Sequence, residues 1–440
     1  MREFATGLAP ICFALLAILC RPGHAQFSQP TTPAPSVNAI AASTLAPPTE
    51  PAGVLTLRAA IALAQTYSPD LQVAAREYDA TEGTLIQSGA RPNPQAGYQL
   101  EDARRETRTT TIGINLPIEL GGKRQARIDS AQKSREAAGA DLATRRQEIR
   151  ATAISHFFDV LTAQERVRLA QDSVELARRA TDATSKRVAA GRVSPVEETR
   201  VKVAEAGAQL EFVQARSELN AARQRMAALW GSRAPQFERA DGNVEAPPAL
   251  PSMERLTSRL EGAPNIRRAE IEVERRRALT DVERTKRIPD VTLTLGAKRP
   301  EELGRNQLVI GVAIPIPVLD TNRGNIYDAA RREDKARDEL LAIRVRLNAE
   351  VLLARERLAS SRDELDLLRG TVLPGATSAY EAATKGYELG RFQFLDVLDA
   401  QRTLFQAKAQ YLRALGEAHR SAAEIDRLLG DEQTIQEKQP

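Results

Sequence analysis

Three short stretches of this chain combine residue types and spacings that could do chemistry. The first is PIELGGKRQARI, residues 117–128, in which an alternating apolar run stops at Gly121 and Gly122 and two basic residues follow. Glycines before a lysine at the end of a strand can cradle a phosphate, but in a P-loop the lysine is followed by Ser or Thr. Here Lys123 is followed by Arg124. The alternative is a corner at which a strand becomes a helix.

The second stretch is LDVLDA, residues 395–400, which contains two carboxylates. Asp396 and Asp399 are spaced i, i+3 at the start of a predicted helix, so they can share one helix face. Stacked rings of carboxylates in a pore favour cations and disfavour anions. Acids in the first turn of a helix also complement the helix dipole without any further role. The residues alone leave both interpretations open.

The third candidate is a pair of similar turns, AAGRVSP at residues 189–195 and ELGRFQF at residues 388–394. Gly191 and Gly390 each follow a predicted long helix, where glycine relieves the left-handed position that ends the helix. Arg192 and Arg391 place a cation beside each helix terminus. The turns can punctuate the helices, contact a partner protein, or do both.

The N-terminus has the form of a secretory signal. Arg2 precedes an apolar run at residues 8–19, and Gly-His-Ala precedes a predicted cleavage after Ala25. Lipidation of Cys20 is the alternative, although Leu19 stands where a lipidated cysteine normally has a small residue. Cleavage would remove both cysteines of the chain and leave a formal charge of +3.

The mature composition argues against several function classes. Without a thiol, and with only His156 and His419, the sequence predicts no metal site, no cofactor and no enzyme. Secretion and balanced charge predict no nucleic-acid binding. No apolar stretch of about 18 residues follows the signal, so any membrane passage must be made by strands.

The elements that position these residues occur twice. Residues 112–118 (IGINLPI) match residues 310–316 (IGVAIPI), 198 positions further on, which indicates an internal repeat. Each half has the order helix, two strands, very long helix, tight turn, helix. The predicted division is signal peptide 1–25; Pro-rich N-terminal arm 26–54; first repeat 55–231, with strands within 94–118, a long helix over 122–190 and a helix over 195–230; connector 232–252; second repeat 253–430, with strands within 290–318, a long helix over 324–388 and a helix over 394–429; and C-terminal tail 431–440.

The four strands alternate apolar and polar residues with a period of two. Residues 111–118 and 307–316 each carry aliphatic side chains on one face. Such a pattern fits an ordinary half-buried sheet or a transmembrane barrel. Four strands cannot close a barrel, since the smallest have eight, so a barrel would have to be shared between chains.

The helices are unusually long. A helix over 122–190 would extend about 100 Å, and the shorter helices over 56–89 and 195–230 together sum to about the same length. In the second half, 254–287 and 394–429 flank the helix over 324–388 in the same way, and Pro374 is expected to bend that helix. Val160, Val167 and Val174 recur at intervals of seven, which favours coiled-coil packing.

The repeat decides between the two interpretations of the glycine stretch. Opposite residues 120–124 the second half has Val318–Asn322 in the same strand-to-helix context, with neither glycine. We therefore interpret PIELGGKRQARI as a strand-to-helix junction.

Over essentially the whole mature chain, these features resemble the TolC-type outer-membrane efflux channels. The duplicated plan, the two turns and LDVLDA carry the resemblance. It implies an α+β membrane protein: a homotrimer whose protomers each give four strands to a 12-stranded barrel in outer-membrane lipid, above a periplasmic tunnel of coiled-coil helices. The stretch LPIELGGKRQAR is most similar to the CzcC-type branch, which works with a periplasmic adaptor and an inner-membrane heavy-metal transporter of the resistance-nodulation-division class.

The resemblance also implies roles for the candidate residues. LDVLDA is similar to the TolC segment that lines the periplasmic constriction, so Asp396 and Asp399 become the expected periplasmic gate. The turns at Gly191-Arg192 and Gly390-Arg391 become the expected adaptor contacts, farthest from the membrane. No residue is expected to be catalytic.

Three functions follow as hypotheses. The first is the exit duct of a heavy-metal efflux pump, and the second is a duct of the same fold for drugs or secreted polypeptides. The third is a periplasmic coiled-coil structural protein that never enters a membrane, against which the four alternating strands argue.

Overall fold

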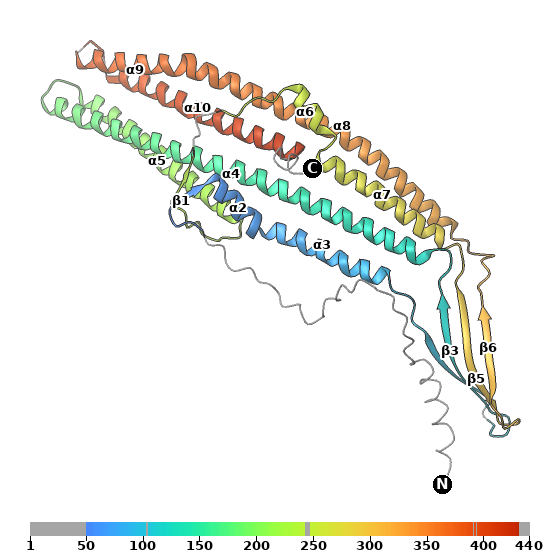
Figure 1. Ribbon diagram of the computed structural model, residues 1–440. Coiled ribbons are helices and arrows are strands. Elements are labelled where there is room, and N and C mark those ends of the chain that lie inside the picture. The colour runs from blue at the N-terminus through green and yellow to red at the C-terminus, as the bar shows by residue number, and fades with distance from the viewer. Residues whose placement is uncertain (1–49, 103, 243–246, 390, 393, 431–440) are drawn as a thin grey trace, which may run out of the picture. The chain divides into compact units, whose positions relative to one another are not determined.

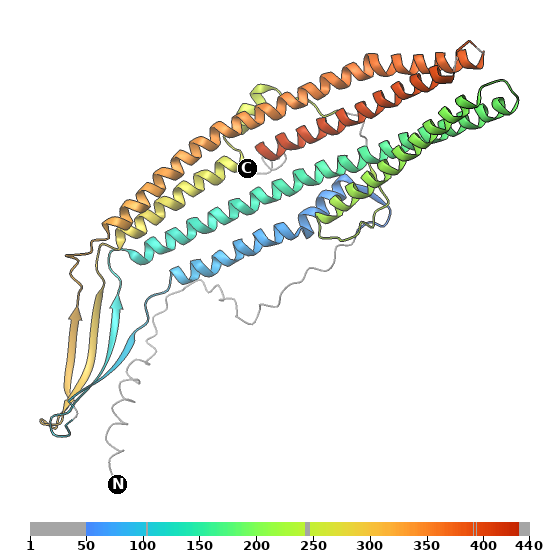
Figure 2. The same ribbon diagram turned by 180° about the vertical axis from the view of Figure 1, so that it is seen from behind.

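The computed structural model describes residues 50–102, 104–242, 247–389, 391–392 and 394–430, all within one unit of the chain. The predicted signal peptide, most of the N-terminal arm and the C-terminal tail lie outside these residues. Long helices run side by side, and the strands of a four-stranded sheet leave them at one end (Figures 1 and 2). The two helix-to-helix turns lie at the opposite end.

The described residues of the first half form three strands and four helices. They are β1 (Val54–Thr56), α2 (Leu57–Tyr67), α3 (Pro69–Ser88), β2 (Gln95–Glu101), β3 (Thr109–Ile118), α4 (Lys123–Ala189) and α5 (Pro195–Ala228).

The second half has the same order of long elements. They are β4 (Arg239–Asp241), α6 (Met253–Leu260), α7 (Pro264–Thr285), β5 (Val291–Pro300), β6 (Gln307–Ala313), α8 (Arg323–Leu367), a π-helical turn (Leu368–Val372), α9 (Leu373–Glu388) and α10 (Phe394–Leu429).

Three of the helices predicted as continuous are interrupted, each at a proline. The helix expected over 56–89 divides into α2 and α3, and the helix over 254–287 divides into α6 and α7. Pro69 and Pro264 each begin the second helix, because proline suits a first helical position and disfavours helix in the residue before it. In the helix expected over 324–388, the π-helical turn directly precedes Pro374.

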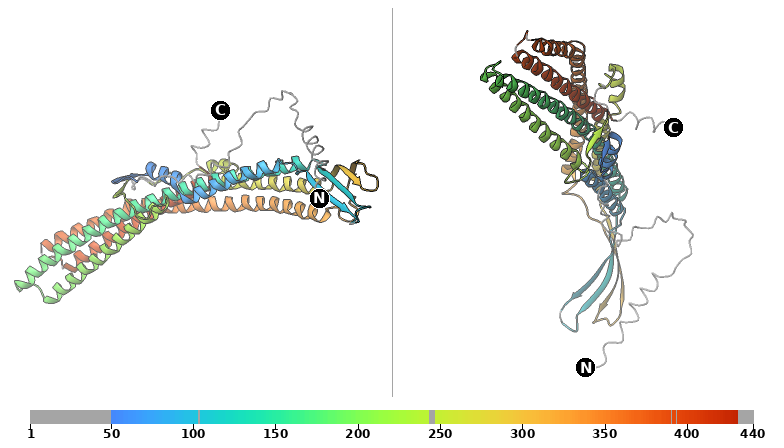
Figure 3. Two further views of the ribbon diagram at one scale, coloured as in Figure 1. Left: turned by 90° about the horizontal axis from the view of Figure 1, so that it is seen from below. Right: turned by 90° about the vertical axis from the view of Figure 1, so that its left-hand side faces the viewer.

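The four long strands form one antiparallel sheet in the order β2-β3-β5-β6. The register pairs Ile112 with Ala297 and Ile114 with Leu295, so aliphatic side chains of neighbouring strands share one face. That face is uncovered in the single chain, and Ile310 is 67% exposed. Thr, Asn, Gln and Gly alternate onto the other face. Figure 3 shows these strands as a twisted ribbon at the end of the helices.

The last strand is shorter than predicted. β6 ends at Ala313, whereas the alternation predicted a strand to residue 316. The cause is its neighbour: β5 starts at Val291, opposite the end of β6, and Pro289 before it has no N–H to donate. Pro315 removes a further donor from the continuing chain.

The glycine stretch forms a junction between β3 and α4, as the repeat predicted. Gly121 and Gly122 have φ of 70° and 74°, and a Cβ on Gly121 would lie 2.7 Å from the Ile288 side chain. Lys123 Nζ lies 2.6 Å from Asp290 Oδ1, and the same oxygen accepts a hydrogen bond from the Leu120 N–H. The lysine is therefore used within the fold, tying α4 to the start of β5.

The junction between β6 and α8 also has a residue in the left-handed conformation directly before the helix, but this residue is an asparagine. Asn322, immediately before α8, has φ of 56°, and its side-chain amide donates to Glu283 at the end of α7. Asparagine tolerates the left-handed conformation better than most residues that carry a side chain. Gly122 and Asn322 thus each take the left-handed conformation directly before a long helix, although the repeat aligns Asn322 with Arg124.

Mostly small residues recur at buried positions along α4 and α5, which pack against each other. The buried positions on α4 recur at seven through Ala163, Ala170, Ala177 and Thr184, and those on α5 through Val201, Ala208, Ala215 and Ala222. Of the valines expected to favour coiled-coil packing, Val160 is fully buried, whereas Val167 and Val174 are only half-buried. From residue 163 onward the buried stripe of α4 is therefore formed mostly by small residues and not by these valines.

The main hydrophobic core lies where β1, α2 and β4 pack against the long helices. Trp230, Phe157 and Phe237 are fully buried there, next to the parallel pair β1 and β4. The Gln164 side chain accepts a hydrogen bond from the Ala240 N–H at 2.7 Å and donates to the Ala240 carbonyl at 3.0 Å. This helix side chain therefore pairs with β4 as a neighbouring strand would.

Candidate functional site

The two helix-to-helix turns end α4 and α9 in the same way. Gly191 has φ of 70°, its N–H donates to the Val188 carbonyl, and the Arg192 N–H donates to the Arg187 carbonyl at 2.9 Å. This is the Schellman arrangement, in which glycine takes the left-handed position. In the second turn the Arg391 N–H donates to the Gly386 carbonyl at 2.8 Å. Gly390 lies outside the described residues.

Both predicted arginines of the turns are exposed to solvent. The α4/α5 hairpin is closed above its turn by the Ser185 hydroxyl, which donates to Glu198 at 2.9 Å. The Lys202 ammonium, and after it this hydroxyl, lower the pKa of Glu198. This hydrogen bond joins α4 to α5 next to the turn, and the Arg192 side chain in the turn stays exposed to solvent.

The predicted acid pair lies on the first two turns of α10. Asp396 and Asp399 are both exposed. The backbone carbonyl of Asp399 accepts a hydrogen bond from the Thr403 hydroxyl, which leaves its carboxylate outside that contact. Asp399 also lines a cavity between α10 and the hairpin formed by α4 and α5. The sequence did not predict this cavity.

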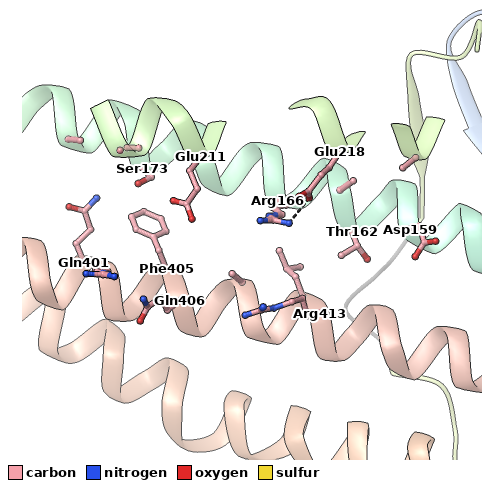
Figure 4. Close-up of a pocket in the computed structure, with 18 of the residues that line it drawn as sticks. Asp159, Thr162, Arg166, Ser173, Glu211, Glu218, Gln401, Phe405, Gln406 and Arg413 are labelled. Carbon is pink, nitrogen blue, oxygen red and sulfur yellow. Dashed lines mark hydrogen bonds and ion pairs between the residues drawn. The ribbon is translucent and has the colours of Figure 1, made fainter. Parts of the chain in front are cut away.

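This cavity has a volume of about 1020 Å³ and lies between the α4/α5 hairpin and α10. Small residues such as Ala177 and Ala208 form part of its wall, and charged residues of both signs form the rest. Arg166 pairs with Glu218 at the α4/α5 side, and Phe405 rises from α10 toward that side (Figure 4). The hairpins accordingly appear as separate arms in Figure 3.

A cation–π contact lies at the far ends of the two hairpins, between the last turn of α4 and the last turn of α9. The guanidinium of Arg187, in the last turn of α4, lies 4.3 Å from the ring centroid of Tyr387, in the last turn of α9. Both residues are half-buried, and a cation–π pair contributes about 0.5–1 kcal/mol at an exposed site and about 2 kcal/mol when desolvated. Sequence reasoning missed both residues, because they are 200 positions apart and neither belongs to a motif.

Known proteins are similar to this chain in sequence and in fold. The family model described as "Outer membrane efflux protein" matches residues 60–232 and again residues 256–431. The chain belongs to the outer membrane efflux protein family. It is 51% identical over 383 residues to the cobalt-zinc-cadmium resistance protein CzcC of Cupriavidus metallidurans, an alignment that covers 87% of this chain and 92% of that protein.

Solved structures agree on the fold. A membrane protein from Pseudomonas aeruginosa superposes with a TM-score of 0.74 at 19% identity, covering 85% of this chain and 92% of its own. A structure of CusC superposes with a TM-score of 0.72 at 17% identity, with the same coverage. The family match and the 51% identity to CzcC confirm the resemblance to outer-membrane efflux proteins that the sequence indicated.

Two histidines of this efflux protein lie where α4 meets α10. His419 is buried and stacks on Phe158 with ring centroids 3.6 Å apart. Burial lowers the pKa of His156, against the opposing effect of the Asp159 carboxylate. Beside them, Arg420 on α10 pairs with Asp159 on α4 at 3.0 Å. These contacts fix α10 to α4 at one end of the cavity, which Asp159 and Arg420 help to line.

Across the described part of the chain, no His, Cys, Asp and Glu side chains gather in a group of three or more that could hold a metal ion. Within the same residues, no helix is both long and apolar enough to span a membrane.

Proposed function

We propose that this chain is the outer-membrane exit duct of a tripartite efflux system that exports heavy-metal cations. The observation that carries the proposal is the 51% identity to a cobalt-zinc-cadmium resistance protein over 92% of that protein's length. A duct needs a path, a gate and docking surfaces, and no catalytic group. Cargo would be selected by the inner-membrane transporter of the resistance-nodulation-division class, reached through a periplasmic adaptor.

The path would run through a homotrimer in the outer membrane. Four antiparallel strands with one aliphatic face and one polar face supply a third of a 12-stranded barrel. β2 and β6 are the edges of the sheet, so each would pair with the opposite edge of a neighbouring copy. The helices would form the periplasmic tunnel, built from two duplicated halves, after residues 1–25 are removed as a signal peptide.

The duct role is tested by deleting the protein from its host and measuring growth in zinc, cobalt, cadmium, nickel and copper salts and in a panel of drugs. We expect tolerance to at least one of these metals to fall, to return with the wild-type chain, and drug tolerance to stay unchanged. Loss of drug tolerance alone would instead support the second hypothesis, a multidrug duct. Recovery of the protein only in the soluble periplasmic fraction would support a structural coiled coil.

The gate is proposed at Asp396 and Asp399, whose exposure on the first turns of α10 supports the role. In a trimer they would form two carboxylate rings that favour cations. In planar bilayers, Asp396→Asn with Asp399→Asn should lower the cation-to-anion permeability ratio. Asp363→Asn, an exposed acid on α8, is the matched control. An unchanged ratio in the double variant would contradict the gate.

The adaptor contacts are proposed at the turns, at Gly191, Arg192, Gly390 and Arg391. Exposure of both arginines beside helix ends supports this. Arg192→Glu with Arg391→Glu should abolish metal tolerance while the trimer still forms. Arg168→Glu, an exposed arginine in the middle of α4, should leave tolerance intact. Retained tolerance in the double variant would place the contact elsewhere.

A further inference from the structure

Two arginines lie on the aliphatic face of the sheet, at the end of the strands away from the helices. The register pairs Arg299 of β5 with Thr110 of β3, on the face that carries Ile112. One step further along, the Glu301 N–H donates to the Arg108 carbonyl at 2.9 Å, which continues the pairing of the two strands. Because side chains alternate between the faces of a strand, Arg108, Arg299 and Glu301 share the aliphatic face.

These three residues, which we call the rim cluster, carry an excess of positive charge. Arg108 Nη2 lies 3.8 Å and Arg299 Nε lies 3.9 Å from the same oxygen, Glu301 Oε1. Both distances exceed that of a hydrogen bond, and one carboxylate balances only one of two guanidiniums. Arg108 Nε has no hydrogen-bond partner among the residues that the structure describes. The rim cluster therefore has a net charge of +1 and can accommodate an anion.

The other charges of the sheet are matched more closely. Lys298 is next to Arg299 in β5 but lies on the polar face, where its ammonium is 3.4 Å from Glu101. At the end of the sheet near the helices, Lys123 lies 2.6 Å from Asp290. The remaining charged residues of the β2–β3 and β5–β6 connections cancel in number: Arg104, Arg105, Arg305, Asp102, Glu106 and Glu302. The excess charge is thus confined to one face and one end of the sheet.

The rim cluster lies directly beyond an apolar band of membrane height. β3 has 10 residues. At about 3.3 Å per residue and a tilt of about 40°, a strand of this length rises about 25 Å, which is the height of the lipid-facing band of a transmembrane barrel. Tyr98, opposite Ile112 and 67% exposed, lies on the same face close to this end, as the aromatic residues of such barrels do. Figure 1 shows the strand connections away from the helices.

We propose that Arg108 and Arg299 bind the phosphate groups of the glycolipid that forms the outer leaflet of the outer membrane. The inference rests on the proposed duct function, because helices in the periplasm place the opposite end of the strands at the outer leaflet. The guanidinium fork matches phosphate oxygens in pairs. The aliphatic side chains next to the rim cluster would contact the acyl chains of the same lipid.

The strength of this site follows from its charges. An arginine close to an anionic lipid surface strengthens binding about fivefold, so two arginines strengthen it about 30-fold at each protomer. Glu301 acts in the opposite direction, because its carboxylate competes with phosphate for the same two guanidiniums. Removing the Glu301 charge should therefore tighten binding, which a purely structural role of the rim cluster does not predict.

The variants separate the two faces of the sheet. Arg108→Gln with Arg299→Gln removes both charges of the site and keeps polar side chains there. Arg299→Gln and Lys298→Gln form the matched pair: they are neighbours in β5, each loses one positive charge, and they lie on opposite faces. Glu301→Gln tests the competing carboxylate.

Binding is measured on the purified full-length trimer in a neutral detergent, by counting bound lipids with native mass spectrometry during a titration. The probe is lipid A, the phosphorylated anchor of the glycolipid, against its dephosphorylated form. We expect the double variant to bind lipid A about 30-fold more weakly than the wild type, and Arg299→Gln about fivefold more weakly. Lys298→Gln should match the wild type, and Glu301→Gln should bind more tightly. Equal binding of both lipids by the wild type, or undiminished binding by the double variant, would overturn the site.

Two further comparisons complete the test. Phosphatidylglycerol that binds the wild type as tightly as lipid A would reject the glycolipid in favour of any anionic lipid. If the double variant does not assemble, Arg108→Gln and Arg299→Gln are measured singly, and wild-type affinity in both would reject the site. A deletion strain with unchanged metal tolerance would contradict the duct while the binding result stands. Metal tolerance without phosphate-dependent binding would contradict the rim cluster alone.

Discussion

Glu50 connects the start of the described chain to the connector between the two halves. Glu50 is buried, with 7% of the residue exposed. Its carboxylate accepts hydrogen bonds from Trp230 Nε1 at 2.8 Å and from the Gln236 N–H at 2.7 Å. Trp230 is the only tryptophan of the chain. Replacing Glu50 therefore perturbs a contact that has its own fluorescent reporter.

The expected magnitude follows from the two donors that Glu50→Ala would leave. The Trp230 indole is fully buried, so its unpaired N–H costs about 1–3 kcal/mol, whereas the Gln236 N–H is reachable by water and costs about 0.5–1.5 kcal/mol. Together the local structure should lose about 1.5–4.5 kcal/mol. Since 1.4 kcal/mol is about a factor of ten, local opening should become about 10- to 1,600-fold more frequent.

Hydrogen exchange of the backbone amides in β1 and β4 measures this opening, because locally unfolding segments exchange on opening. In Glu50→Ala these amides should exchange faster by that factor, and Trp230 emission should shift to longer wavelength. Glu50→Gln keeps one acceptor oxygen, so its exchange rates should lie between those of the wild type and of Glu50→Ala. Glu238→Ala, a neighbouring exposed acid, should match the wild type. Unchanged exchange and emission in Glu50→Ala would refute the reasoning.

Three further outcomes are expected. Gly296→Ala should reduce the yield of heat-labile trimer on gels, because its Cβ would lie 2.7 Å from a backbone oxygen of β3, whereas Gly311→Ala, with its nearest contact at 3.4 Å, should assemble normally. Burial lowers the pKa of His156, so the unfolded chain binds the proton first as pH falls below about 6.5. The wild type should therefore lose thermal stability from pH 7.5 to 5.5 more steeply than His156→Phe; parallel curves would contradict this. Gln164→Ala should speed proteolysis of the connector, because β4 loses both of its bonds to α4.

Several parts of the candidate site were accessible from the sequence because they depend on local chemistry. Glycine at the end of a long periodic run predicted the turn at Gly191, and its left-handed φ bears this out. The strand-to-helix interpretation of Gly121 and Gly122 needed only the comparison of two halves. The Arg187–Tyr387 pair was not accessible, since no local pattern tells which of many surface arginines meets which ring.

The π-helical turn before Pro374 was partly accessible from the sequence. Its signal, a step of five between Leu368 and Leu373 where a coiled-coil seam has steps of three and four, is present in the sequence. It becomes legible only when the buried positions are known, because α8 also carries exposed aliphatic residues, such as Leu341 and Val345, that define competing registers. The proline was visible and a bend was expected there. The change of hydrogen bonding before it was not.

By itself the sequence determined the class of this protein, the order of its elements and the sheet's aliphatic face, because strand alternation and helix length are periodicities of the chain itself. Only the tertiary structure decided which stripe of α4 is buried, where β6 ends and where a cavity opens between the hairpins. These features depend on neighbours: a helix with two apolar stripes can bury either one, and a strand continues only as far as its partner does.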